Sequence, residues 1–298
     1  MGSKYMDNYT FEEIKNEIAI LKKSFFQVRL VDPNACQIME PAKVNGKFTL
    51  IPSGVCYDTW FHPDQCINCT SSRALRTDQI HSKCETCNDK LFYITARPVR
   101  IENHPLVLEI VQPMSYPDIC PGNSEENTLL SQFRSLNRKI LLDSETSAYN
   151  REYLAEHLPN IFSEVQEHRT VNAALIHLKS YDNIQETYGS VAASGVICRL
   201  YKILQTTLSL TDCPDTILAR YENDTFFVLD KSHTYTQLCS CIRLIQKQSA
   251  TQHILYQSQL LPFELESSTV SLNTEQICDS KQLFSLLLER LSSSDSPQ

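Results

Sequence analysis

The scarcity of glycine constrains this chain most, because it holds six glycines in 298 residues. Average usage would be about 7%. No two of them lie five residues apart, so neither the GxxxxGK phosphate loop nor the GxGxxG turn can be written anywhere. Both motifs need glycine so that backbone amides can approach phosphate without a Cβ in the way. The sequence therefore excludes the folds that bind nucleotides through these two loops.

The charge balance argues against a nucleic-acid partner. Lys and Arg number 27 against 35 Asp and Glu, which gives a net charge of −8, whereas phosphate neutralisation needs a basic face. The amino-terminal segment is too charged to form the apolar core of a signal peptide. No stretch reaches the ~18 apolar residues that a membrane span needs. We therefore expect a cytoplasmic protein with no nucleic-acid partner and no membrane contact.

The first half of the chain predicts a small α+β module. Thr10 and Glu13 form a capping box, and apolar residues follow at spacings of 3, 4, 3 and 4, which predicts a helix over 10–25. This seam could pack on its own domain or on a second copy. A strand over 25–33 and an irregular, cysteine-rich middle come next. Two β runs joined by a Glu-Asn-His turn then close the module.

A proline-rich linker follows this module. Residues 113–124 contain three prolines and a glycine, a composition typical of loops. Beyond the linker, Leu129, Phe133, Leu136 and Ile140 repeat at spacings of 4, 3 and 4. This spacing predicts a helix that is placed to pair with a second copy and to transmit rotation between two domains.

Helices and strands alternate in the second half. A helix over 151–167 leads to the strand AALIHL, one long helix is predicted over 184–208, and ILARY and FFVLD form a β-hairpin. The resulting βαββαβ-like order predicts a sheet containing antiparallel strands, with helices packed on it. The predicted organisation is a module over 1–115, a linker and signalling helix over 116–142, and a domain over 143–298.

Three motifs occur in order in the second half: DSETSAYNREYL, ALIHLKSYDNIQETYG and RYENDTFFVL. They resemble the D-x-L-T-G-L-x-N-R-R-x-L, A-L-I-D-I-D-x-F-K-x-I-N-D-x-x-G and R-Y-G-G-D-E-F-x-V-L motifs of the GGDEF domains of diguanylate cyclases, over roughly 143–291. The resemblance implies a nucleotide-cyclase-like fold. It also implies that family's reaction, which joins two GTP molecules into cyclic di-GMP. Each GTP is held by one subunit of a dimer, with divalent metal on its triphosphate.

The sequence departs from this family where metal and phosphate bind. His177 stands at the metal-binding aspartate of the first strand, and Lys179 stands at the next acidic place. Magnesium prefers oxygen ligands and rarely accepts imidazole. Glu222 and Asn223 replace the two hairpin glycines, so a Cβ and a negative charge would face the triphosphate. The resemblance therefore implies that the metal site and the phosphate cradle are lost.

The remaining motif positions are mostly altered too. Asp224 keeps an acidic place of the motif, while Thr225 replaces its glutamate. At the guanine-reading places, Gln185 stands for asparagine and Ser194 for aspartate. We therefore expect no magnesium site and no catalytic residue, with the fold retained for assembly or signalling.

A cluster of cysteines in the first half suggests metal or redox chemistry. Cys66 and Cys69 form one C-x-x-C pair and Cys84 and Cys87 another, close to zinc-ribbon spacing, with Cys56 nearby. Four thiolates would hold Zn²⁺ or an iron–sulfur cluster. Against this, the second pair lies on a predicted strand, where residues three apart point to opposite faces. Reduced thiols, or a thiol switch at the first pair, are the alternatives.

The cysteine-rich segment CYDTWFHPDQCINCTSSRAL resembles a variant of the PAS-like sensor modules that precede GGDEF domains, over roughly 20–115. This resemblance implies an antiparallel sheet that acts as a sensor. The favoured function is a homodimeric signalling protein whose PAS-like sensor controls a catalytically inactive GGDEF-like output domain. That domain would bind a protein partner, or weakly bind GTP or cyclic di-GMP. The alternatives are an active diguanylate cyclase and a metal or redox sensor.

Overall fold

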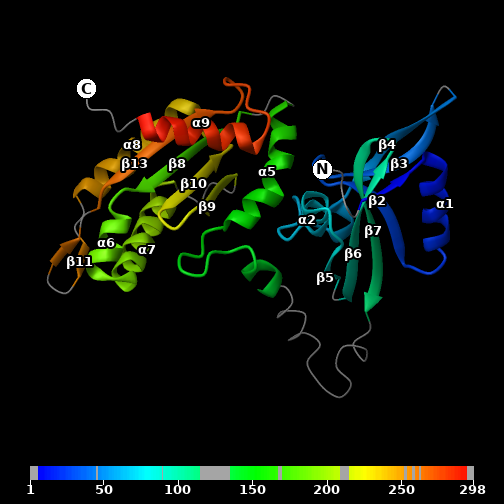
Figure 1. The fold of residues 1–298 in the computed structure, drawn as a ribbon, viewed down its shortest axis with the longest axis horizontal. Helices are drawn as coiled ribbons and strands as arrows, with labels where there is room; N and C mark the ends of the chain where they lie inside the picture. The colour runs from blue at the N-terminus through cyan, green and yellow to red at the C-terminus, as the bar shows by residue number, and fades with distance from the viewer. Residues whose placement is uncertain are drawn as a thin grey trace, which may run out of the picture. The chain divides into compact units, whose positions relative to one another are not determined.

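The computed structural model divides into two compact units, Met1–Ile140 and Leu141–Gln298. Both units combine helices with β-sheet, which confirms the predicted α+β class (Figure 1). The residues that the structure describes are 6–44, 46–88, 90–114, 135–166, 170–208, 215–251, 254–256, 259–261 and 263–293.

The first unit is built on a seven-stranded sheet in the order β1-β6-β7-β2-β3-β4, with β5 beside β6. The two β runs predicted at the end of the module form the hairpin β6–β7, and its turn residues Glu102 and Asn103 both have positive φ. The strands are β1 (Asp7–Tyr9), β2 (Gln27–Asp32), β3 (Gln37–Val44), β4 (Lys47–Val55), β5 (His81–Cys87), β6 (Lys90–Ile101) and β7 (His104–Met114).

The predicted irregular middle is wrong for residues 37–55, which form the antiparallel hairpin β3–β4. No residue of these two strands is fully buried. Strands without a fully buried residue give only a weak hydrophobic signal in the sequence.

The predicted amino-terminal helix is confirmed as α1 (Phe11–Leu21). Its capping box forms as expected, since the Glu13 amide donates to Thr10 Oγ1 and the Thr10 amide donates to Glu13 Oε2 at 2.8 Å. Phe11 and Ile14 are buried against Val28 and other apolar residues of the sheet. These two residues of the seam therefore pack within their own unit, and a homodimer that pairs through this helix stays a prediction.

The opposite face of the same sheet carries the 3-10 turn η1 (Asp58–Trp60) and the helix α2 (Thr70–Thr77). Trp60 packs with Phe92, Ile94 and Val111, while Ala74 of α2 packs on the same two strands, β6 and β7. This face holds both cavities of the unit discussed below.

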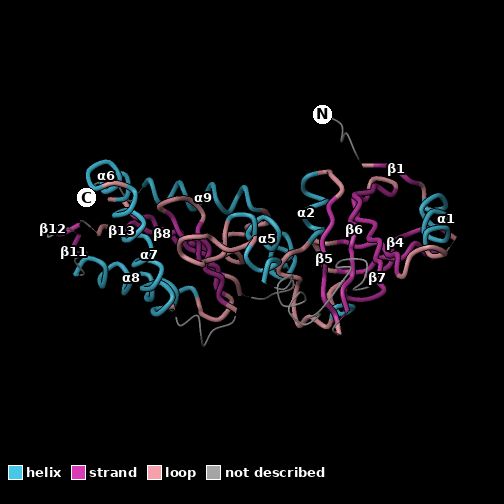
Figure 2. The backbone as a smooth tube through the Cα atoms, turned by 90° about the horizontal axis from the view of Figure 1, so that it is seen from below, coloured by secondary structure: helices cyan, strands magenta, loops and turns pink. Residues whose placement is uncertain are grey.

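The second unit centres on a four-stranded antiparallel sheet in the order β13-β8-β10-β9. Phe226 is buried with α6, α7 and α8, whereas Phe227 on the other face lies 5.2 Å from Phe284 of α9. Figure 2 shows α8 and α9 on opposite sides of these strands. The elements are α5 (Arg151–Gln166), β8 (Asn172–Leu178), α6 (Tyr181–Tyr188), α7 (Ser190–Thr207), β9 (Thr216–Arg220), β10 (Thr225–Asp230), α8 (Tyr235–Thr251), β11 (Ile254–Tyr256), β12 (Gln259–Leu261), β13 (Leu265–Ser271) and α9 (Ser280–Ser293).

The single long helix predicted over 184–208 is wrong, because the chain breaks into α6 and α7 at Gly189. Gly189 has φ 85° and ψ 170°, a conformation that is essentially open to glycine alone. Its carbonyl then accepts the first intrahelical bond of α7, from the Ala193 amide.

The predicted signalling helix lies only partly within the described residues. Leu136 and Ile140 of the predicted signalling helix are each 54% exposed, while Leu129 and Phe133 lie outside the described residues.

Within the described ranges, no helix has both the length and the apolar composition needed to cross a bilayer.

Candidate functional site

The hairpin between β9 and β10 carries the altered motif RYENDTF. The Thr225 amide donates to the Glu222 carbonyl at 3.4 Å, and the Tyr221 amide donates to the Thr225 carbonyl at 2.9 Å. Neither Glu222 nor Asn223 has a positive φ, and both are exposed. The turn therefore forms without backbone strain. What the two side chains at the glycine positions change is the space and the charge next to the turn.

His177 lies on β8 directly between Thr225 of β10 and Glu266 of β13 in the sheet register. Its Nε2 is 3.1 Å from Asp224 Oδ2, and its Nδ1 is 3.8 Å from Glu266 Oε2. Thr225 Oγ1 donates to the other Asp224 oxygen at 2.8 Å. The structure therefore brings three of the predicted positions together and adds Glu266, which no sequence motif had indicated.

Charges within this cluster compensate one another. The Lys179 ammonium forms an ion pair with Glu266, so His177 and Lys179 face two carboxylates. The hydrogen bond to Asp224 raises the pKa of His177, although burial opposes the shift. Burial alone would raise the pKa of Asp224, but hydrogen bonds from His177 and Thr225 outweigh it and the pKa is lowered. Both oxygens of Asp224 are therefore already bonded within the chain, one to His177 and the other to Thr225.

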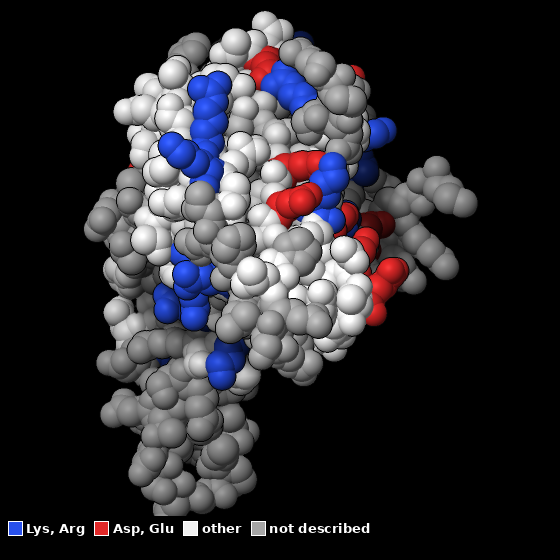
Figure 3. Space-filling view, turned by 90° about the vertical axis from the view of Figure 1, so that its left-hand side faces the viewer, with Lys and Arg blue, Asp and Glu red and all other residues white. Residues whose placement is uncertain are grey.

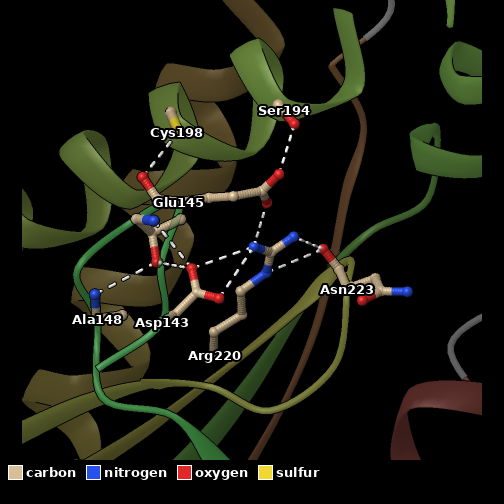
Figure 4. A network of polar contacts seen from close by, with 8 residues as sticks. Asp143, Glu145, Ala148, Ser194, Cys198, Arg220 and Asn223 are labelled. Atoms are coloured by element: carbon tan, nitrogen blue, oxygen red, sulfur yellow. Dashed lines mark hydrogen bonds and ion pairs between the residues drawn. The ribbon is translucent and has the colours of Figure 1, made fainter. Parts of the chain in front are cut away.

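Arg220 ties this hairpin to the DSETSAYN segment (Figure 4). Its Nη1 donates to Asp143 Oδ1 at 3.1 Å and pairs with Glu145, while its Nη2 donates to the Asn223 carbonyl at 2.7 Å. The Arg220 side chain is only 8% exposed. A guanidinium this well buried needs these partners, because an unpaired buried charge is costly.

Local hydrogen bonds explain why the DSETSAYN segment folds as it does. Asp143 Oδ1 accepts from the Thr146 amide at 2.9 Å and from Thr146 Oγ1 at 2.6 Å, which closes a turn. Ser147 then adopts φ 65°, at the position where the GGDEF motif has glycine. Asn150 Oδ1 accepts from the Tyr153 amide and so caps α5.

The two positions predicted at the guanine site have different environments. Ser194 on α7 donates through Oγ to Glu145 Oε1 at 2.6 Å, and Cys198 Sγ donates to the Glu145 carbonyl at 3.5 Å. Gln185 on α6 is exposed. Glu145 is therefore the residue that sequence reasoning missed here; its replacement of a motif leucine was the available signal.

On the face of this unit drawn in Figure 3, most of the Asp and Glu side chains lie from the centre toward the right of the view. Near the centre of that view, Asp and Glu lie against Lys or Arg, and separate basic groups lie to the left. Across the described residues, no group of three or more His, Cys, Asp or Glu is arranged to hold a metal ion. The expected absence of a magnesium site stays a prediction.

Three of the clustered cysteines line one small cavity of the first unit, of about 20 Å³, between α2 and the sheet. They are Cys56, Cys66 and Cys69, and the cavity wall also includes Lys83 and Glu109. Burial raises the pKa of Cys66 to about 11 and raises the pKa of Cys69 as well. Burial of both thiols therefore favours their protonated form.

The second cysteine pair lies on β5, which continues unbroken through Cys87 and pairs with β6 along its whole length. Cys84 and Cys87 are three residues apart on this strand, so their side chains leave opposite faces of the sheet. Cys87 packs near Trp60 and Phe92. A zinc ribbon that uses both C-x-x-C pairs is therefore not formed, and a metal site at the cysteines stays a prediction.

Comparison with known proteins identifies the second unit. Residues 140–285 match the family described as "Diguanylate cyclase, GGDEF domain". This stretch is a GGDEF domain. No curated protein matches the chain.

Solved structures resemble this chain at low identity. The GGDEF domain of FimX from Pseudomonas aeruginosa is 17% identical with a TM-score of 0.43, covering 52% of this chain and 92% of its own. The coiled coil and GGDEF domain of DgcB from Caulobacter crescentus, solved with c-di-GMP, is 15% identical with a TM-score of 0.47, covering 56% and 84%. Vibrio cholerae LapD, bound to c-di-GMP, is 18% identical with a TM-score of 0.46, covering 57% and 38%.

We predict that Arg220→Met destabilises the GGDEF domain by about 3–5 kcal/mol, because it leaves Asp143 and Glu145 without their buried cation. Urea denaturation followed by circular dichroism measures the change. The matched control is Arg290→Met, since Arg290 is 40% exposed in its ion pair with Glu275. The control is expected to lose no more than about 1 kcal/mol. Equal losses in the two variants would contradict the prediction.

The His177–Asp224 contact predicts a pH-dependent stability. Because the pKa of His177 is raised on folding, its contribution is fully present below the unfolded value of about 6.5 and is lost as pH rises through the folded pKa. The lowered pKa of Asp224 acts oppositely, since its contribution is lost only as pH falls through its folded pKa, below about 3.9. His177→Gln should therefore lower the urea midpoint more at about pH 5.5 than at about pH 8.5.

The matched control for this measurement is His104→Gln, because His104 is exposed at the start of β7. Its effect on the urea midpoint should be small and equal at both pH values. A His177→Gln loss that is the same at both pH values, or larger at the higher one, would refute the assigned contact.

Proposed function

We propose that this protein is a signalling protein in which a PAS-like sensor controls a catalytically inactive GGDEF-like output domain. The proposal rests on one observation, the contact between His177 and Asp224. In the family pattern, the place of His177 belongs to an aspartate that binds metal. Here an imidazole fills that place and engages the acidic residue that remains, so the oxygen ligands that magnesium needs are not supplied.

Charge at the hairpin supports the same proposal. The exposed Glu222 stands in front of the turn where a triphosphate would approach. Two like charges at about 4 Å repel by about 4 kcal/mol at an effective dielectric of about 20. Ser194 stands at a guanine-binding position of the family, and its hydroxyl is used here in a hydrogen bond to Glu145. The domain is therefore proposed to bind GTP or cyclic di-GMP weakly at most, and to act through a protein partner.

A metal or redox sensor is the second candidate function. It is favoured by the convergence of Cys56, Cys66 and Cys69 on one cavity beside the buried Lys83. Lys83 is bonded to Glu85 and to the Asn68 carbonyl, and its positive charge lowers the pKa of the nearby thiols against the larger effect of burial. Elemental analysis of anaerobically purified protein distinguishes this candidate, with zinc or iron near one equivalent supporting it.

The full-length protein is expected to make no cyclic di-GMP from GTP and Mg²⁺. Product is measured by liquid chromatography and mass spectrometry, with a heat-denatured sample as the blank and an active diguanylate cyclase as the positive control. Accumulation of cyclic di-GMP well above the blank would contradict the proposed inactivity and favour the active-cyclase alternative.

The homodimer is proposed to assemble through the exposed Leu136 and Ile140. Light scattering of the full chain should give a mass near twice the monomer mass of 34.1 kDa. Leu136→Glu combined with Ile140→Glu should shift the mass to the monomer value, because it places charges in the apolar seam. The matched control is Ile80→Glu, at a residue that is 61% exposed elsewhere in the unit. A monomeric unmodified protein, or a double variant that remains dimeric, counts against this seam.

A further inference from the structure

Two buried cysteines face each other at the open end of the β3–β4 hairpin. Gln37 pairs with Val55 in the sheet register, and one position further the Cys56 amide donates to the Cys36 carbonyl at 2.9 Å. Cys36 and Cys56 are therefore directly opposed, one residue beyond the ends of the two strands. The Cα atoms of directly opposed residues lie about 4.5–5.5 Å apart, which is within the range of about 4.4–6.8 Å that a disulfide bond spans.

The two cysteine side chains also lie on the same side of the hairpin. Both are buried in one small apolar cluster with Val31. Cys36 Sγ donates to the Pro33 carbonyl at 3.7 Å. The pKa of the Cys56 thiol is raised, first by its hydrogen bond with Cys36 and then by burial. The two sulfur atoms are therefore neighbours.

The backbone at Cys36 has a conformation that favours glycine. Cys36 has φ 53°, in the left-handed region. The preceding turn holds it there, because Asp32 Oδ1 accepts from the amides of Asn34 and Ala35 at 3.0 and 3.2 Å. Non-glycine residues in this region cluster at functional sites, where the surrounding structure fixes them. A cysteine in the place that suits glycine therefore points to a use for its thiol.

A bond between these two sulfur atoms would close the hairpin at its open end. The segment between Cys36 and Cys56 contains β3 and β4 completely, and neither strand has a fully buried residue. Burial therefore contributes less to this hairpin than to β6 and β7, whose strands are largely buried. A covalent link at the open end would restrict its opening and would fix the chain just before it enters η1.

We propose that Cys36 and Cys56 form a reversible disulfide when the protein meets a hydroperoxide. The thiolate of one cysteine attacks hydrogen peroxide, so that the O–O bond breaks, a sulfenic acid forms and the departing hydroxide takes a proton to become water. The second thiol attacks the sulfenic sulfur, so that the S–S bond forms, the S–O bond breaks and a second water leaves. Two thiols are thereby oxidised by two electrons and one peroxide is reduced to two waters.

This proposal gives the redox-sensor candidate a pair of thiols other than Cys66 and Cys69. The signalling meaning of the bond rests on that candidate function. Formation of the bond does not, because it depends only on the two facing cysteines and the oxidant. A dithiol reductant reverses the reaction by thiol–disulfide exchange.

The test maps the cysteines of the full-length protein after exposure to hydrogen peroxide. Remaining thiols are blocked with iodoacetamide, and the protein is digested without reduction for mass spectrometry. Trypsin cuts between the two cysteines, at Lys43 and Lys47, and chymotrypsin then separates Cys56 from Cys66. The expected product is a pair of peptides joined through the two proposed sulfur atoms, two hydrogens lighter than the separate thiol peptides and released by dithiothreitol.

Three outcomes of this mapping would overturn the proposal. The first is a bond from Cys56 to Cys66 or Cys69 in place of Cys36. The second is full alkylation of Cys36 and Cys56 after exposure to the peroxide. The third is oxidation of either sulfur to sulfinic acid with no bond between the two.

A glycine variant tests the role of Cys36 without disturbing its turn. Cys36→Gly removes the thiol and keeps the left-handed backbone, which glycine adopts readily. It should form no bond and should leave Cys56 as a sulfenic acid, which dimedone traps. Equal dimedone labelling of Cys56 in the unmodified protein would reject Cys36 as its partner. The matched control is Cys278→Ser, at an exposed cysteine of the second unit, which should form the bond to the same extent as the unmodified protein.

Hydrogen exchange measures the effect of the bond on the hairpin. Exchange of the β3 and β4 amides should be slower in the peroxide-treated protein than in the reduced protein. This difference should be absent in Cys36→Gly. Equal exchange in the two forms of the unmodified protein would reject closure of the hairpin.

These measurements separate the disulfide from the proposed function of the second unit. A mapped bond together with cyclic di-GMP synthesis would uphold the disulfide and reject the inactive output domain. Absence of the bond together with absent synthesis would reject the disulfide alone.

Discussion

A buried guanidinium must be fully paired, and the second unit is arranged around this requirement at Arg220. Its partners come from two segments: the turn that holds the carboxylates of Asp143 and Glu145, and the backbone of the β9–β10 hairpin. Glu145 in turn binds Ser194 on α7. One cation therefore fixes the relative positions of a turn, a hairpin and a helix, and these positions do not depend on any catalytic function.

The cluster around His177 is also held by paired charges, at the place where the family pattern has its metal-binding residues. The domain supplies its own positive charges there, from His177 and Lys179, and sets them against Asp224 and Glu266. An active site that waits for metal must leave its carboxylates uncompensated. A site whose charges are already balanced within the chain can instead remain folded and rigid without any ligand. This charge balance supports the proposal of an output domain that keeps its fold without a metal ion.

The sequence predicted the features that depend on neighbouring residues. The capping box at Thr10, the β6–β7 and β9–β10 hairpins and the order of the three motifs all follow from short-range patterns, and the structure contains them. The role of Glu266 could not be predicted, because its contact with His177 depends on strand pairing between distant segments. The β3–β4 hairpin was not predicted, because it is half exposed. The break at Gly189 was not predicted either, because the helices on both sides of it share one apolar pattern. The larger cavity of the first unit, lined by Trp60 and Phe61, lacked any motif, since its walls come from three separated segments.

Trp60 has a further consequence, because this one ring forms part of the wall of both this larger cavity and the cysteine cavity. A shared wall cannot move toward one space without moving away from the other. Thermodynamic linkage is reciprocal. If an event in one cavity changes the free energy of an event in the other, the second event changes the free energy of the first by the same amount. The indole thus belongs to the walls of two neighbouring cavities, so a movement of this one ring changes the space in both.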